Sequence, residues 1–281
     1  MPFVISNTSG TFKYASQKNF DKYDALKRKE LGIELDSNIP LDNMLMLYRF
    51  NTGDLNTTGA TYKLANYAPY NQGAIVAYDA NVGTDINPYI TIDNSSYIVG
   101  NGSLNISVRG LSGITGPTIV IGASFAFTHT VWFKLVGTIA VYDRIADWGG
   151  PGWFQIMSSQ TSSANYLFWN IRITGGAQIQ IEIQVNVMDG AWHHVATVCS
   201  SSGDWTIYID NIAYTKASPL WRVISNAGTN SIGNLIAGTW STTIIGGGGS
   251  TRTFAGNRDD IRLYSRELTS TEIGQIYNYR G

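Results

Sequence analysis

The amino-acid sequence predicts an all-β protein built as a sandwich of two antiparallel sheets. Its 281 residues are 43% hydrophobic and 12% aromatic and include 30 glycines, a composition typical of strands and turns rather than helices. Several segments alternate apolar with polar residues at a period of two, as strands with one face in a core do. The segment 178–185, Q-I-Q-I-E-I-Q-V, is the clearest, with its isoleucines inward and a polar, hydrogen-bonding face outward. Sandwiches of this size commonly form one domain.

The expected strands follow one another with turns rich in Asn, Gly and Ser between them. They are predicted over 44–50, 74–80, 90–92, 97–99, 104–108, 124–136, 137–142, 166–173 and 178–185. A hairpin then pairs 192–199 with 205–210 across a turn at 200–203. In the hairpin, Trp192 and Trp205 are expected in the core.

The C-terminal segment predicts one more strand and a short helix. Ile261 and Leu263 alternate with polar neighbours, which indicates a strand with one face in the core. A helix is expected after it, capped by Thr269 or Ser270, with Glu272 in its first turn.

Three motifs in this order carry a family resemblance: W-H-H-V-A at 192–196, Y-I-D-N at 208–211 and G-N-R-D-D-I-R-L-Y at 256–264. They resemble the C-terminal half of laminin G-like domains, which belong to the concanavalin A-like lectin/glucanase jelly rolls and have pentraxins among their relatives. With weaker similarity at 44–54 and 124–134, the resemblance covers about residues 44–281. It implies a jelly-roll sandwich, a fold that hosts lectins, hydrolases, adhesion modules and inert spacers.

Charge and cysteine content exclude several classes of function. With 19 basic and 20 acidic side chains the formal net charge is −1, so the chain lacks the positive field that nucleic acids require. The single cysteine, Cys199, rules out an intramolecular disulfide and is expected to be a buried thiol. No apolar run is long enough to span a membrane.

The N-terminus carries neither the basic region nor the long apolar region of a secretory signal. The chain is therefore expected on a virion or other particle surface, or outside the cell by a route without such a signal.

Residues 1–43 differ from the remainder because they hold a dense charge cluster at 21–36. This N-terminal arm is predicted to contain a short amphipathic helix, which either folds back on the sandwich or docks on a partner. Its apolar stripe consists of Phe20, Tyr23, Leu26 and Leu31.

Glycoside hydrolysis is not expected, because glutamates are scarce. The related glucanases use the pattern E-x-D-x-x-E, and the nearest match has Glu34 and Asp36 but Ile39 in place of the second glutamate. Between Leu35 and Arg266 the chain holds one glutamate, Glu182. No catalytic residue is therefore assigned.

The three histidines favour structural roles. His193 and His194 are adjacent on one strand and must face opposite sides of the sheet, so they cannot bind one metal ion together. His129 belongs to no metal-binding or nucleophilic motif.

The resemblance implies one metal site, a structural calcium at Asp259, where relatives often place an aspartate at the start of the last strand. Calcium takes six to eight oxygen ligands. Asn56 departs from the Asp-x-Ser-Gly that relatives often show, which weakens the assignment. The alternative is that the Asp259 carboxylate accepts backbone N–H bonds. No other cofactor is implied.

Carbohydrate recognition would need exposed aromatic rings that stack on sugars, with amides and carboxylates around them. A loop over 147–153, D-W-G-G-P-G-W, presents two tryptophans, and two more lie near Pro219 and in the last third of the chain. The four candidates are Trp148, Trp153, Trp221 and Trp240. Large aromatic rings in loops can equally cap the ends of the sandwich.

Taken together, these features predict a module without catalytic activity. The main prediction is a structural or interaction component of a large assembly, such as a minor capsid or surface protein of a virion, which docks on protein partners through the N-terminal arm. The alternative is a glycan-binding lectin or adhesion module, and a glycoside hydrolase ranks third.

Overall fold

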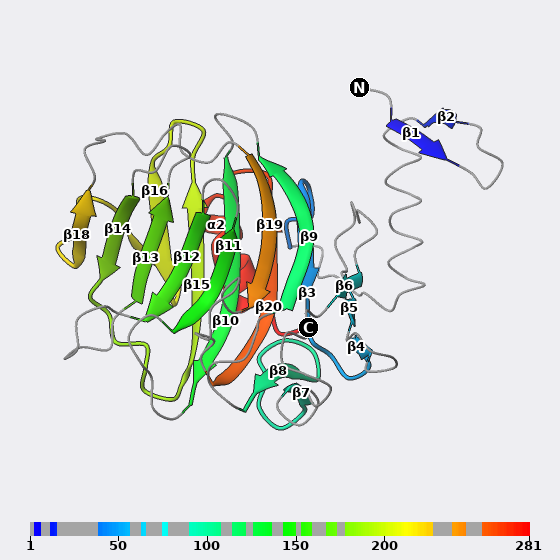
Figure 1. Cartoon of the computed structure of the whole chain (residues 1–281), viewed down its shortest axis with the longest axis horizontal. Helices are drawn as coiled ribbons and strands as arrows, with labels where there is room; N and C mark the ends of the chain where they lie inside the picture. The colour runs from blue at the N-terminus through cyan, green and yellow to red at the C-terminus, as the bar shows by residue number, and fades with distance from the viewer. Residues whose placement is uncertain are drawn as a thin grey trace. The chain divides into compact units, whose positions relative to one another are not determined.

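The computed structural model covers the whole chain (Figure 1). It describes residues 3–6, 12–15, 39–56, 63–65, 75–77, 90–107, 114–121, 126–136, 143–149, 153–158, 167–172, 178–226, 238–245 and 255–281. The chain divides into two compact units, Met1–Ile39 with Gly281 and Pro40–Arg280. In the first unit, β1 (Phe3–Ser6) and β2 (Phe12–Ala15) form an antiparallel hairpin.

The second unit contains an eight-stranded antiparallel sheet built around β10, β15 and β20. Its order is β17 (Ile212–Tyr214), β16 (Trp205–Ile209), β15 (Trp192–Cys199), β10 (Phe127–Leu135), β20 (Gly256–Tyr264), β8 (Ser103–Ile106) and β7 (Ile90–Asp93), and β3 (Met44–Tyr48) also pairs with β20. The hairpin predicted from W-H-H-V-A and Y-I-D-N is confirmed as β15 and β16.

A seven-stranded antiparallel sheet lies against the first (Figure 1). Its order is β18 (Trp221–Asn226), β14 (Gln178–Ile183), β13 (Leu167–Arg172), β12 (Trp153–Ser158), β11 (Arg144–Gly149), β19 (Gly238–Ile245) and β9 (Ile114–Ile121). A small sheet contains β4 (Leu55–Asn56), β5 (Lys63–Ala65) and β6 (Ile75–Ala77). The predicted sandwich of two antiparallel sheets is confirmed.

The core lies between the two large sheets. The indole N–H of Trp169 on β13 donates to the hydroxyl of Thr197 on β15 at 3.0 Å, which ties one sheet to the other. Phe127 and Trp205 meet edge to face with ring centroids 5.6 Å apart. Cys199 is buried as predicted, and burial raises the pKa of its thiol to about 12.

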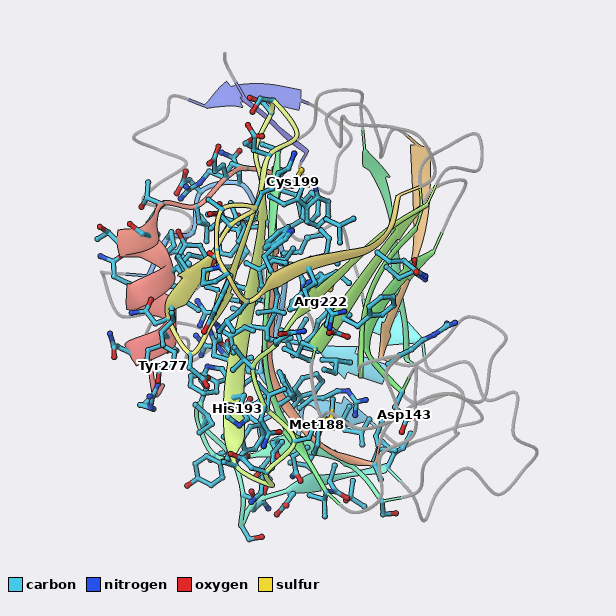
Figure 2. All side chains as sticks on the ribbon, turned by 90° about the vertical axis from the view of Figure 1, so that its left-hand side faces the viewer. Asp143, Met188, His193, Cys199, Arg222 and Tyr277 are labelled. Atoms are coloured by element: carbon cyan, nitrogen blue, oxygen red, sulfur yellow. The ribbon has the colours of Figure 1, made fainter. Side chains whose placement is uncertain are left out.

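One helix of the described residues, α2 (Ser270–Asn278), begins where the sequence predicts it. Thr269 caps it, and Glu272 completes the capping box by accepting from the backbone N–H of Thr269 at 2.8 Å. Figure 2 shows α2 on the side of the eight-stranded sheet away from the seven-stranded sheet. There the ring of Tyr277 stacks on that of Trp132, with the ring centroids 5.3 Å apart. The helix therefore covers the outer face of the eight-stranded sheet.

Two predictions about local structure were wrong. Residues 97–99 form no strand, because the backbone N–H groups of Ile98 and Val99 bind a side chain instead of a neighbouring strand. The loop expected over 147–153 is wrong at both ends, since β11 extends to Gly149 and β12 begins at Trp153. The arm helix over 21–36 and the strand over 137–142 lie outside the described residues.

Candidate functional site

A row of polar residues crosses all seven strands of the seven-stranded sheet in register. Across the sheet it consists of Ser225, Gln180, Asn170, Gln155, Asp147, Thr243 and Thr115. On β13 and β14, Asn170 and Gln180 alternate with Trp169 and Ile181, which lie in the core between the sheets. Because successive strand residues face opposite sides, the row belongs to the outer face of this sheet.

The end of this face at β14 and β18 is open to solvent. Arg222 on β18 pairs with Glu182 on β14, and its Nη1 lies 3.3 Å from the Glu182 Oε1. The side chain of Arg222, labelled in Figure 2, is 54% exposed, whereas that of Glu182 is fully buried. Gln180 and Gln184, two positions before and after Glu182 in the chain, are half-buried.

Gln184 completes a fixed cluster of donors and acceptors at this end. Its side-chain oxygen, in the orientation that satisfies the hydrogen bonds, accepts from the Arg222 Nε at 3.2 Å and Nη1 at 2.5 Å. Bonds from a charged donor are about twice as strong as neutral ones. Arg222 is therefore held in place by Glu182 and Gln184 while half of its surface stays available to a ligand.

The sheet does not bring two carboxylates together. Within the bounds of its seven strands there are two acidic residues, Asp147 on β11 and Glu182 on β14. Three strand intervals separate β11 from β14, which is roughly 14 Å at the usual spacing of about 4.8 Å. The carboxyl groups of glycosidases lie about 5–9.5 Å apart.

All four predicted sugar-binding tryptophans belong to strands of this sheet. Trp148 is in β11, Trp153 in β12, Trp221 in β18 and Trp240 in β19. The placement of Trp148 and Trp153 in a loop was wrong, because β11 extends to Gly149 and β12 begins at Trp153.

The register separates the four tryptophans into two groups. Trp153 is opposite Arg172 and two positions from Gln155, in step with the polar row. Trp148 is opposite Phe154, Trp221 opposite Ile183 and Trp240 opposite Ile119. Trp221 is half-buried and packs against the core, so it is not a free stacking ring.

Asp259 lies fully buried in β20 and binds backbone N–H groups. Its Oδ2 accepts from Ile98 at 2.9 Å and from Val99 at 2.8 Å, and its Oδ1 accepts from Asp260 at 2.8 Å. Burial raises the pKa of this carboxyl, and the three N–H donors oppose the rise. The residues present do not fit calcium, because the three donors already engage both oxygens and no acidic or histidine cluster able to hold a metal occurs in the described part of the chain.

The histidines take three different environments. His194 is buried under α2, with its ring 5.8 Å from that of Tyr277, and burial lowers its pKa to about 3. Burial likewise lowers the pKa of His129 to about 3. His193 lies between two carboxylates, with Nδ1 2.6 Å from the Asp210 Oδ2 and Nε2 3.0 Å from the Asp189 Oδ1. None of these arrangements presents a catalytic base on the polar row.

A family model described as the concanavalin A-like lectin/glucanases superfamily matches residues 109–274, more than half of the 281-residue chain. The chain belongs to this superfamily. The predicted resemblance to laminin G-like and concanavalin A-like domains is thereby confirmed. No curated protein matches the sequence.

Solved structures with the same fold include binding domains and an enzyme. Domain 4 of AbnA, an extracellular GH43 arabinanase from Geobacillus stearothermophilus, in complex with arabinotriose, has a TM-score of 0.51 at 13% identity, over 84% of this chain and 98% of that one. The binding domain of Paraclostridial Mosquitocidal Protein 1 also has a TM-score of 0.51 at 13% identity, over 84% of this chain and 52% of that one. Trypanosoma rangeli sialidase in complex with sialic acid has a TM-score of 0.50 at 12% identity, over 96% of this chain and 41% of that one.

These similarities show a shared concanavalin A-like sandwich. This chain spans about half the length of the mosquitocidal binding domain and less of the sialidase. No helix in the described residues is long and apolar enough to cross a membrane.

The polar row was only partly visible in the sequence. The alternation in 178–185 marks the β14 positions, but on β12 and β13 the apolar Met157 and Phe168 share the parity of Gln155 and Asn170. On β11 a bulge between Arg144 and Ala146 shifts the register ahead of Asp147. The polar row appears once the strand register is known.

Proposed function

We propose that this protein is a saccharide-binding module without catalytic activity, and that its ligand lies across the outer face of the seven-stranded sheet. The observation that carries the proposal is the row of amide, hydroxyl and carboxyl residues in register on all seven strands. Sugar hydroxyls both donate and accept, so a mixed row of this kind matches them. The half-exposed Arg222 adds a fixed charged donor at one end.

The positions of the carboxylates support binding without hydrolysis. Asp147 and Glu182 are separated by too many strands to act on one glycosidic bond. Glu182 is also buried and paired with Arg222, so it is poorly placed to protonate a leaving group.

The similar solved structures also support saccharide binding. The Geobacillus domain of this fold is described in complex with arabinotriose, and the match spans 98% of that domain and 84% of this chain. We therefore take arabinotriose as the first probe, followed by a glycan array that covers neutral and acidic saccharides.

The direct test is calorimetric titration with the best array ligand. Arg222→Gln and Gln180→Ala should each weaken binding by about tenfold, because each removes hydrogen bonds of about 1 kcal/mol or more. Val223→Thr is the matched control, since Val223 follows Arg222 on β18, is opposite Ile181 and faces the other side. Equal affinity of all three variants and the wild type would place the ligand elsewhere.

The absence of catalysis has its own measurement. Incubation of the protein with the bound saccharide should release no reducing ends above the rate in buffer. Turnover that disappears in Asp147→Asn or Glu182→Gln would contradict the proposal.

The assembly function predicted from the sequence rests on Phe20, Tyr23, Leu26 and Leu31, which lie outside the described residues. A virion or particle location, and docking on protein partners, therefore stay predictions.

A further inference from the structure

The segment between β7 and β8 is fastened to the eight-stranded sheet on both sides of Tyr97. The Asp259 carboxylate accepts from the backbone N–H groups of Ile98 and Val99. On the other side, the Asn257 amide donates to the carbonyl of Ser96 at 3.5 Å and to the Asp93 carboxylate at 2.9 Å. The backbone that carries Tyr97 is thus held by side chains of β20.

The hydroxyl oxygen of Ser96 accepts hydrogen bonds from side chains of two neighbouring strands. Lys134 Nζ on β10 lies 3.4 Å from the Ser96 Oγ, and Trp192 Nε1 on β15 lies 3.3 Å from it. Lys134 and Trp192 are themselves cross-strand partners. A serine oxygen has two lone pairs, so when both accept, the O–H proton is left to donate elsewhere.

This corner therefore offers donors and positive charge. No ion pair joins Lys134 to any residue that the structure describes, and its ammonium keeps two further N–H groups beyond the one on Ser96. Half-buried cations usually have an anionic partner. The open N–H groups and the Ser96 O–H together suit one carboxylate or sulfate group.

Two aromatic residues are tied to this corner: Trp192 donates to Ser96, and Tyr97 follows Ser96 in the chain. Tyr97 is 42% exposed, on the backbone held at Ser96 and Ile98, and Trp192 is half-buried. An aromatic ring that is already held in place loses little conformational entropy when a ligand stacks on it. Trp192 was expected in the core, and this was wrong: on β15 it shares the face of His194, opposite to that of the core residue Val195, and so lies on the outer face.

We propose that Ser96, Tyr97, Lys134 and Trp192 form a second binding site, here named the Ser96 corner, for an anionic saccharide such as a uronic acid or a sulfated sugar. The acidic group accepts from Lys134 and Ser96, and the sugar ring stacks on Tyr97. The Ser96 corner belongs to the eight-stranded sheet and shares no residue with the polar row, so it does not depend on the function proposed above.

Hexagalacturonate and its methyl ester are matched probes, because they share the sugar rings and differ in charge. Titration followed by NMR shifts of the tryptophan indole N–H signals should show saturable binding of the acid form, with the Trp192 signal shifted. The ester should bind at least tenfold more weakly, since it lacks the charge that the Lys134 hydrogen bond needs. Sulfated hexasaccharides from chondroitin serve as a second acidic probe.

Single substitutions test whether the acidic probe binds at the Ser96 corner. Lys134→Gln and Tyr97→Ala should each weaken binding of the acidic probe by about tenfold, while thermal unfolding confirms that both fold. Lys216→Gln is the control for charge, because Lys216 is exposed in the turn between β17 and β18. Arg222→Gln should leave the titration of the Trp192 indole signal unchanged, because Trp192 belongs to the Ser96 corner and not to the polar row.

Three results would overturn the proposal. They are no saturable binding of either acidic probe, equal binding of hexagalacturonate and its ester, or equal losses in Lys134→Gln and Lys216→Gln, which would indicate a non-specific charge effect.

Discussion

Arg222 on β18 lies directly opposite Glu182 on β14, with Nη1 3.3 Å from Oε1, and the exposed guanidinium covers a carboxylate that has no exposed surface. A buried carboxylate must be paired, because desolvation of a lone charge costs several kcal/mol. The glutamate thus fixes the arginine that the polar row presents to a ligand.

Arg222→Ala should lower the free energy of unfolding by about 1–3 kcal/mol, since it leaves Glu182 with fewer partners. Adding Glu182→Gln should recover most of the loss, because the buried charge is then gone. Urea unfolding of the wild type, both single variants and the double variant measures this coupling. Additive effects would show that the two side chains do not depend on each other.

The tryptophans give a second prediction, from strand register. Trp153→Ala should weaken saccharide binding by tenfold or more, about 1–3 kcal/mol of lost stacking and burial, because Trp153 is in step with Gln155. Trp148→Ala should reduce stability and leave affinity unchanged, since Trp148 is opposite Phe154. Calorimetry measures the affinity of both variants and thermal unfolding their stability. If Trp148→Ala lost affinity and Trp153→Ala lost only stability, the faces assigned from the strand register would be wrong.

The sequence predicts the sandwich well because alternation reports directly on the sheet faces. In 178–185, Ile181 and Ile183 lie in the core as expected. In the same segment Glu182 was expected on an exposed polar face, yet it is fully buried. Alternation separates the two faces of a strand, but it cannot tell that Arg222 on the neighbouring strand covers Glu182 on the outer face.

The C-terminal helix shows the same limit. His194 and Arg262 point away from the core, as a period of two requires, but both are fully buried. Tyr277 of α2 packs on His194, and Tyr279 lies with its ring 5.3 Å from the Arg262 guanidinium. The helix itself was predictable from Thr269 and Glu272. Its docking face was not, because it depends on contacts between residues far apart in the sequence.

Asp259 provides a test of the implied calcium site. Chelation should leave the thermal midpoint unchanged, because three backbone N–H groups already hold the carboxylate. Asp259→Ala should lower the free energy of unfolding by about 1–3 kcal/mol with or without chelator, since it leaves these buried donors unpaired. A bound calcium ion would instead raise the free energy of unfolding by about 2.7 kcal/mol when free calcium is at a hundredfold excess over its dissociation constant. If chelation lowered the thermal midpoint of the wild type and not that of Asp259→Ala, Asp259 would be a calcium ligand.

The arm prediction is tested by two truncations. Residues 40–43 contact β20 and the residues after it: Tyr264 Oη donates to the Pro40 carbonyl at 3.1 Å, and the backbone N–H of Ser265 donates to the Asn43 carbonyl at 2.8 Å. Deleting 1–39 should therefore leave the thermal midpoint of the sandwich unchanged, whereas deleting 1–43 should cost about 1–2 kcal/mol.

If the arm docks on a partner, the 40–281 chain folds but no longer enters the assembly, and saccharide binding is retained. Co-sedimentation with the assembly and circular dichroism measure the two properties. Unfolding of the 40–281 chain would place the arm within the fold of the sandwich, and full incorporation would remove its docking role.

His193 predicts a specific dependence of stability on pH. Partial burial alone would lower its pKa, but the carboxylates of Asp210 and Asp189 outweigh burial and raise it. Because the folded-state pKa exceeds the ordinary value of about 6.5, the stabilisation is fully present below about pH 6.5 and is lost as pH rises through the raised value.

The difference in unfolding free energy between wild type and His193→Gln should therefore be largest near pH 6 and shrink toward pH 9, with a slope of at most about 1.4 kcal/mol per pH unit. His129 and His194 have lowered pKa values, so both proteins lose stability as pH falls below about 6.5, and this common effect cancels in the difference. Urea unfolding from pH 5 to 9 measures the difference. A value independent of pH would show that His193 stays neutral between its two carboxylates.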